Sequence, residues 1–85
     1  MDKLRKKVIR VLRRRFGDVT DALEQVESTG RVTGVVVSSA FNGLSDKERQ
    51  VRLWQAIEDG MTPREQADVG PIAALTPAEA NVKAM

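Results

Sequence analysis

The stretch RVTGVVVS, residues 31–38, decides the fold because it is the clearest strand in the chain. Five of its eight residues are Val or Thr, whose branched side chains favour an extended backbone. Thr29-Gly30 just before it is a turn signal, and a strand needs a partner. We therefore expect residues 22–27 to pair with it in a hairpin. Taken alone, residues 18–29 slightly favour a helix capped by Asp18, which is the alternative.

Before the hairpin, the chain has the pattern of an amphipathic helix. Apolar side chains fall at offsets of 0, 4, 7, 8 and 12, which is one helical face: Leu4, Val8, Val11, Leu12 and Phe16. Gly17 suits the left-handed residue that closes a helix. Residues 13–15 are all Arg, and cations in a last turn interact favourably with the helix dipole.

Residues 41–45, Phe-Asn-Gly-Leu-Ser, lead from the strand into a second helix. We expect Phe41 in the core and Gly43 at a positive φ. Ser45 is the expected N-cap, in a capping box with the glutamate three residues on. The helix is expected to end near Gly60. Its expected inward side chains, with two flanking ones, are Val51, Trp54, Ile57, Leu53 and Ala56.

The C-terminal part adds one strand between two short helices. Thr62 is an N-cap followed by Pro at the first helical position. Residues 67–75 return as a strand, which Pro71 makes an edge strand or an irregular one. Thr76 caps a last helical turn in the same way, and residues 81–85 are expected to fray.

The resulting order of elements, α-β-β-α-(α)-β-(α), predicts a two-layer α+β sandwich. Its three-stranded mixed sheet would carry the helices on one face. A chain of 85 residues makes one domain, which we place at residues 1–80. Such a short chain buries only about two-thirds of its unfolded surface, so its core is thin.

Charge is spread unevenly along the chain. Residues 1–16 hold eight Lys or Arg and one acid, for a net charge of +7, whereas the other 69 residues hold six bases and eleven acids, for −5. This asymmetry favours an anionic partner for the N-terminal helix. The expected nucleic-acid-binding residues are Arg5, Lys6, Arg10, Arg13, Arg14, Arg49 and Arg52. The alternative is a solvated helix face that keeps the protein soluble.

Histidine and cysteine are both absent. The chain therefore lacks imidazole and thiolate metal ligands, the commonest general base and the cysteine nucleophile. We expect no enzyme, no catalytic residues, no metal site and no cofactor. No apolar run approaches the roughly 20 residues of a membrane span, and no apolar segment follows the basic N-terminus as in a signal peptide. A cytoplasmic protein, monomeric or weakly dimeric, without a membrane partner, is expected.

At residues 35–45, VVVSSAFNGLS, the chain resembles BolA-like proteins. Their signature is a β-branched strand, then S-x-x-F-x-G-x-S, then E-R and an aromatic residue on the helix, here Glu48, Arg49 and Trp54. The run LTPAE at residues 75–79 resembles the L-T-P-E-E that closes such domains. The likeness spans about residues 3–79, and its specific part is residues 35–54.

The resemblance implies a fold related to the type II KH arrangement, with residues 22–27 as a strand. It also implies two roles, namely partnering a monothiol glutaredoxin around a shared 2Fe–2S cluster and binding nucleic acid in regulation. Where family members carry a ligand histidine before the last strand, this chain has Asp68 or, with a gap, Gly70. A carboxylate is a hard ligand that is poorly matched to iron–sulfur sites.

Two functions therefore remain open. The first is a regulatory, nucleic-acid-binding domain that uses the basic helix to contact DNA or RNA. The second is an interaction module that docks a monothiol glutaredoxin-like partner without supplying a cluster ligand. In that case the sheet edge and last strand form the interface, with Asp68 and Gly70 as candidate interface residues.

Overall fold

The computed structural model describes residues 3–84. The helices are α1 (Lys3–Phe16), the short 3-10 helix η1 (Ser39–Phe41), α2 (Asp46–Gly60), α3 (Pro63–Gln66) and α4 (Pro77–Ala84). The strands are β1 (Thr20–Gln25), β2 (Val32–Val37) and β3 (Val69–Leu75). The predicted order of helices and strands is therefore confirmed.

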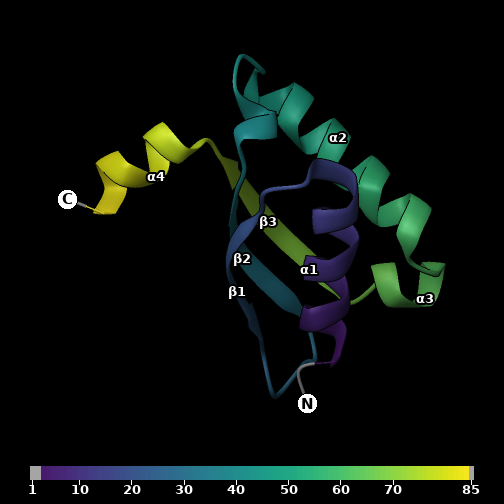
Figure 1. The fold of residues 1–85 in the computed structure, drawn as a ribbon. Coiled ribbons are helices and arrows are strands. Elements are labelled where there is room, and N and C mark those ends of the chain that lie inside the picture. Colours follow the sequence, from purple (N-terminus) through teal and green to yellow (C-terminus); the bar gives the residue numbers. More distant parts are fainter. Residues whose placement is uncertain (1–2, 85) are drawn as a thin grey trace.

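The three strands form one mixed sheet in the order β1-β2-β3. β1 and β2 are an antiparallel hairpin, with Thr20 opposite Val37 and Gln25 opposite Val32. β3 runs parallel to β2, because α2 and α3 carry the chain across the sheet between them. Figure 1 shows α1, α2 and α3 on one face of the sheet, whereas α4 projects beyond it. The small α+β architecture with helices on one face is as predicted.

The hairpin prediction is correct, and the helical alternative for residues 18–29 is wrong. β1 begins two residues earlier than expected and ends before Val26. Its backbone pairs along its whole length with β2. The backbone hydrogen bonds from β1 to β2, a strand that its β-branched residues strongly favour, therefore outweigh the weak helical pattern of residues 18–29. Leu23, at the centre of β1, is the strand's buried side chain.

The core lies between the sheet and the two long helices. Phe41 is fully buried and its ring lies 5.1 Å from that of Phe16, at an interplanar angle of 58°. This tilted geometry is one that aromatic pairs prefer. The other side chains with the least exposure come from α1, α2 and β2: Val8, Leu12, Leu53, Ile57, Val32 and Val36. Ile9 is also buried, although it is not one of the apolar residues predicted to form the inner face of α1.

The expected helix boundaries follow from their capping residues. Gly17 has φ +82° and donates its N–H to the carbonyl of Arg13, which closes α1. Gly43, at φ +78°, turns the chain toward α2. Both Ser45 and Thr62 form complete capping boxes. Each of these local predictions is confirmed.

The buried face of α2 differs from the prediction. Leu53, Ala56 and Ile57 are buried, Trp54 is half-buried against the core, and Val51 is 47% exposed. The helix carries two overlapping apolar stripes, and packing against α1 selects the stripe that holds Leu53. Placing Val51 inward was therefore wrong.

The C-terminal end of the described chain is the helix α4, which continues to Ala84. The fraying expected at residues 81–85 stays a prediction. Met85 lies outside the described residues. Thr76 and Glu79 exchange backbone-to-side-chain hydrogen bonds of 2.8 and 3.3 Å, which start the helix. Within residues 3–84, no helix combines the length and the apolar character that crossing a membrane requires.

Candidate nucleic-acid interface

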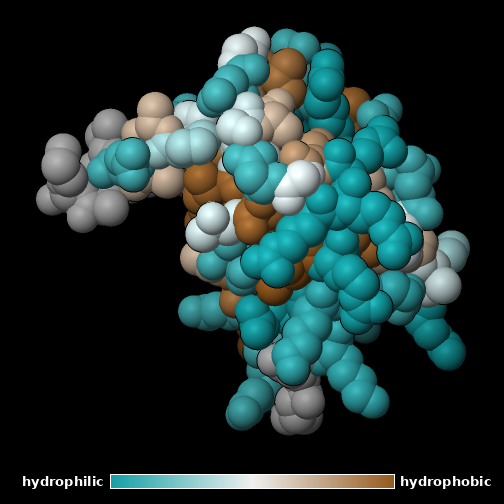
Figure 2. All heavy atoms as spheres, in the orientation of Figure 1, coloured by the Kyte–Doolittle hydropathy of each residue, from teal (hydrophilic) through white to brown (hydrophobic). Residues whose placement is uncertain are grey.

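The face of α1 that points away from the core carries a row of cations. At 100° per residue, spacings of four, three and four place Lys3, Lys7, Arg10 and Arg14 in line, and we call these four residues the basic stripe. They lie opposite the buried Val8–Leu12 side of the helix. In Figure 2, hydrophilic side chains dominate the surface over α1. The stripe is therefore a positively charged ridge, exposed at Lys3, Arg10 and Arg14.

Arg10 and Arg14 are the two arginines of the stripe, and they lie one turn apart. Four residues of helix rise about 6 Å. Both side chains are exposed, and no hydrogen bond or ion pair within residues 3–84 engages either guanidinium. Each guanidinium therefore presents its N–H donors to solvent, in a planar geometry that matches phosphate oxygens.

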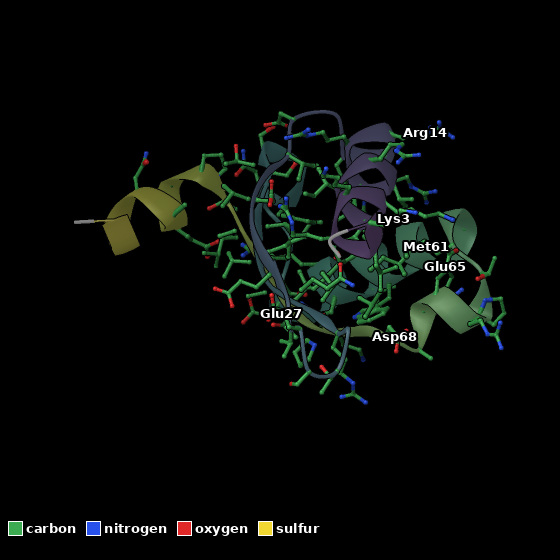
Figure 3. All side chains as sticks on the ribbon, turned by 90° about the horizontal axis from the view of Figure 1, so that it is seen from below. Lys3, Arg14, Glu27, Met61, Glu65 and Asp68 are labelled. Carbon is green, nitrogen blue, oxygen red and sulfur yellow. The ribbon has the colours of Figure 1, made fainter. Side chains whose placement is uncertain are left out.

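Lys7 has a structural partner as well as a place in the stripe. Its Nζ donates to both carboxylate oxygens of Glu65, at 2.7 and 2.8 Å. This hydrogen bond is the main reason that the pKa of Glu65 lies below its ordinary value. Figure 3 shows Glu65, from α3, beside α1. Lys7 therefore fastens α3 to α1.

Two further arginines of α1 are also engaged by neighbouring elements. Arg15 pairs with Asp59 of α2 at 3.2 Å. Arg13 donates its Nε–H to the carbonyl of Val19 at 3.3 Å, while its side chain remains largely exposed. Arg13 and the exposed Lys6 line the β1 side of the stripe, so both predicted residues lie next to it.

Arg5 lies away from the stripe. Its guanidinium pairs with Asp21 of β1 at 3.3 Å, and its backbone N–H donates to the Gln25 side chain at 3.4 Å. Arg5 lies two residues before Lys7 on α1, so the two side chains point about 160° apart around the helix axis. Sequence reasoning placed Arg5 with the other cations, whereas the structure uses it to join α1 to the sheet.

Arg49, one of the expected nucleic-acid-binding residues, is buried in the structure. It is only 8% exposed, and its Nη1 forms an ion pair of 2.6 Å with Glu79. Its guanidinium also donates to the carbonyls of Leu44 and Ala74, at 3.0 and 3.2 Å. These three acceptors satisfy the buried charge, which leaves Arg49 unable to meet a nucleic acid. Arg52 is exposed on α2 but lines none of the depressions beside α1.

A depression at the start of α1 brings in a cation that the sequence did not indicate. Arg64 of α3 lines it together with Lys3 and Lys6, although 58 residues or more separate it from them in the chain. The i, i+4 and i+7 spacing could have revealed Lys3 and Lys7 as members of the stripe. Nothing in the local sequence could have placed Arg64 beside them.

The two candidate interface residues of the last strand occupy different environments. Asp68 is exposed just before β3 (Figure 3). It lines the same depression as Lys3 and Arg64. Gly70 is buried, and a Cβ there would lie 2.7 Å from Cγ2 of Thr33. Gly70 therefore permits the close approach of β3 to β2.

The side chains described for residues 3–81 do not gather into a metal site: no three aspartates, glutamates, histidines or cysteines come together there. The chain matches no family model, no curated protein and no solved structure.

Proposed function

We propose that this chain is a non-enzymatic, BolA-like domain that binds nucleic acid through the basic stripe of α1. The observation that carries the proposal is the exposed pair Arg10 and Arg14, one turn apart, with no partner within residues 3–84. Lys3 extends the same row toward the start of the helix, and Lys6 and Arg13 flank it. Unneutralised arginines in a row attract a chain of phosphates.

Binding through this surface should be tolerant of sequence. The cations of the stripe point outward from the helix. They therefore contact phosphates and make no hydrogen bonds to the edges of bases. The affinity should fall steeply with salt, with a log–log slope of roughly −0.9 for each phosphate engaged on duplex DNA. This behaviour suits a regulatory domain that associates with nucleic acid without choosing its own target sequence.

The test is a double charge reversal, Arg10→Glu with Arg14→Glu. Both side chains are exposed, so the fold should persist, and fluorescence anisotropy should show the loss of oligonucleotide binding at low salt. The matched control is Lys47→Glu with Arg52→Glu, which changes the net charge equally at exposed sites on α2. The control should lower the affinity far less, because its charges lie outside the stripe.

Two results would contradict the proposal. The first is the absence of any binding of DNA or RNA by the wild-type chain at low salt. The second is equal weakening by the two double reversals, which would reduce the effect to net charge. Either result would make the stripe a solvated helix face.

A second candidate function is docking of a monothiol glutaredoxin-like partner at the β3 edge. It is favoured by the position of β3 at the end of the sheet, with the exposed Asp68 directly before it. An edge strand offers unpaired backbone groups to a partner, although Pro71 lacks an N–H to donate. Binding that persists at high salt and is lost on blocking this edge would favour the second candidate.

A further inference from the structure

A groove runs between the C-terminal half of α1 and the end of α2. Val11, Ala56 and Gly60 supply its apolar lining. The two helices touch here, since a Cβ on Gly60 would lie 2.7 Å from Cγ1 of Val11. On the face that carries α1, Figure 2 shows apolar surface between the hydrophilic side chains.

The charges around the groove are not balanced. Four cations line it, namely Lys7, Arg10, Arg14 and Arg15, against the single acid Asp59. Arg15 is paired with Asp59, and Lys7 with Glu65 outside the groove. Arg10 and Arg14 therefore remain as two guanidinium groups beside an apolar lining.

We infer that this groove seats one unstacked nucleotide of a single-stranded nucleic acid, an inference that rests on the proposed nucleic-acid binding. Arg10 and Arg14 hold successive phosphates, and the ribose or base lies against Val11 and the end of α2. The outward ridge alone would serve a duplex and a single strand alike. The apolar groove adds contacts only for a strand whose bases can leave the stack.

The residues that line the groove determine how selective it is among bases and between single strands and duplexes. Among the described residues, no aromatic side chain lines it, so the base makes apolar contact with Val11 and the end of α2 in place of aromatic stacking. With no side chain placed to read a base edge, the site should accept any base. Its preference is for the single-stranded form over the duplex, not for a sequence.

The test compares oligothymidylate with a duplex of equal length at one salt concentration, using wild-type protein and two acid-to-amide variants. Asp59→Asn removes the acid that lines the groove among the described residues, at a side chain that is 71% exposed. Glu58→Gln is the matched control, since Glu58 is the neighbouring residue but lines a different depression beside Trp54. Both changes raise the net charge by one unit.

Wild-type protein should bind oligothymidylate more tightly than the duplex. Asp59→Asn should raise that affinity about threefold, because a unit charge about 7 Å from a phosphate in water contributes about RT. Glu58→Gln should have a smaller effect. Inorganic polyphosphate, which has phosphates but no bases, should compete less well than oligothymidylate per phosphate.

Three outcomes would overturn the groove as the seat of a single strand while leaving the basic stripe in place. These are equal or tighter binding of the duplex, equal effects of the two amide variants, and equal competition by polyphosphate. Failure of the proposed function looks different, because then neither the single strand nor the duplex binds at low salt.

Discussion

Arg49 joins three segments from inside the domain. Its guanidinium contacts the carbonyl before α2, a carbonyl in β3 and the first turn of α4. The carboxylate of Glu79 accepts from both Arg49 and the backbone of Thr76. The backbone hydrogen bond from Thr76, followed by that from Arg49, lowers the pKa of Glu79. One buried cation thus determines where the last helix leaves the sheet.

Replacing Arg49 with methionine should destabilise the fold. The aliphatic chain is roughly conserved, but the carbonyls of Leu44 and Ala74 lose their donor, at a cost of about 2–3 kcal/mol. For a domain of this size that corresponds to a melting temperature lower by roughly 10–20 °C. The measurement is thermal unfolding followed by circular dichroism.

Arg52→Met is the matched control, on the same helix but at an exposed position. It should change the free energy of unfolding by less than about 0.5 kcal/mol. Equal melting temperatures for the two variants would mean that the contacts of Arg49 contribute nothing net to stability.

At the scale of elements, the close contact between α1 and α2 depends on Gly60, which has no side chain. Gly60 is the last residue of α2, and its Cα faces the methyl groups of Val11. A Cβ there would approach both methyl groups to within 2.9 Å. Val is stiff about χ1, so it cannot easily swing away. This position explains why a residue with poor helix propensity stands inside the last turn.

Gly60→Ala should therefore lower the melting temperature, although the same change at a helix position without such a contact stabilises by about 1 kcal/mol. The reason is overpacking against Val11. In a Val11→Ala background the clash disappears, and Gly60→Ala should become neutral or stabilising. A double-mutant cycle measures this coupling. A melting temperature that rises on Gly60→Ala alone would refute the packing argument.

The sequence predicted elements wherever local chemistry specifies them. The capping box at Ser45 and the left-handed residues Gly17 and Gly43 each need only a few neighbouring residues. The face of α2 could not be predicted in this way, because two overlapping stripes were available and only contact with α1 distinguishes them. Arg49 was misplaced for a similar reason, since its partner Glu79 lies 30 residues further along the chain.

In the candidate site too, the local sequence determines some features and tertiary contacts determine the others. Arg10 and Arg14 could be identified as outward-facing from helical periodicity alone. The pairs that engage Lys7 and Arg15 could not, because α3 and the end of α2 supply Glu65 and Asp59 from distant parts of the chain. Local pattern therefore finds the cations, whereas the tertiary fold decides which of them remain available to a phosphate.

On the scale of the whole molecule, three carboxylates whose pKa is lowered hold separate segments together. Asp18 accepts hydrogen bonds from Ser38 and Ser39, which join the start of β1 to the end of β2. Glu65 joins α3 to α1, and Glu79 joins α4 to α2. Each carboxylate accepts these hydrogen bonds fully only when it is ionised. The stability of the domain should therefore depend on pH in the acidic range.

The pKa values of these groups give the sign of that response. The side-chain hydrogen bond from Ser39 is the largest cause that lowers the pKa of Asp18 below its ordinary 3.8, and Glu65 and Glu79 are lowered from 4.5. In acid, the unfolded chain therefore binds protons before the folded chain does. The stabilisation is complete above the unfolded pKa values and is lost as the pH falls through the folded ones.

We therefore expect the free energy of unfolding, measured by urea titration, to fall steadily below about pH 5. The triple variant Asp18→Asn, Glu65→Gln, Glu79→Gln should be less stable at neutral pH and should show a flatter acid limb. The matched control replaces three exposed glutamates whose side chains make no hydrogen bond or ion pair with the described residues: Glu24, Glu27 and Glu58. Its acid limb should keep the wild-type slope, because those carboxylates join no two segments. If the two triple variants have the same slope, the acid response comes from overall charge and not from the three carboxylates that connect the segments.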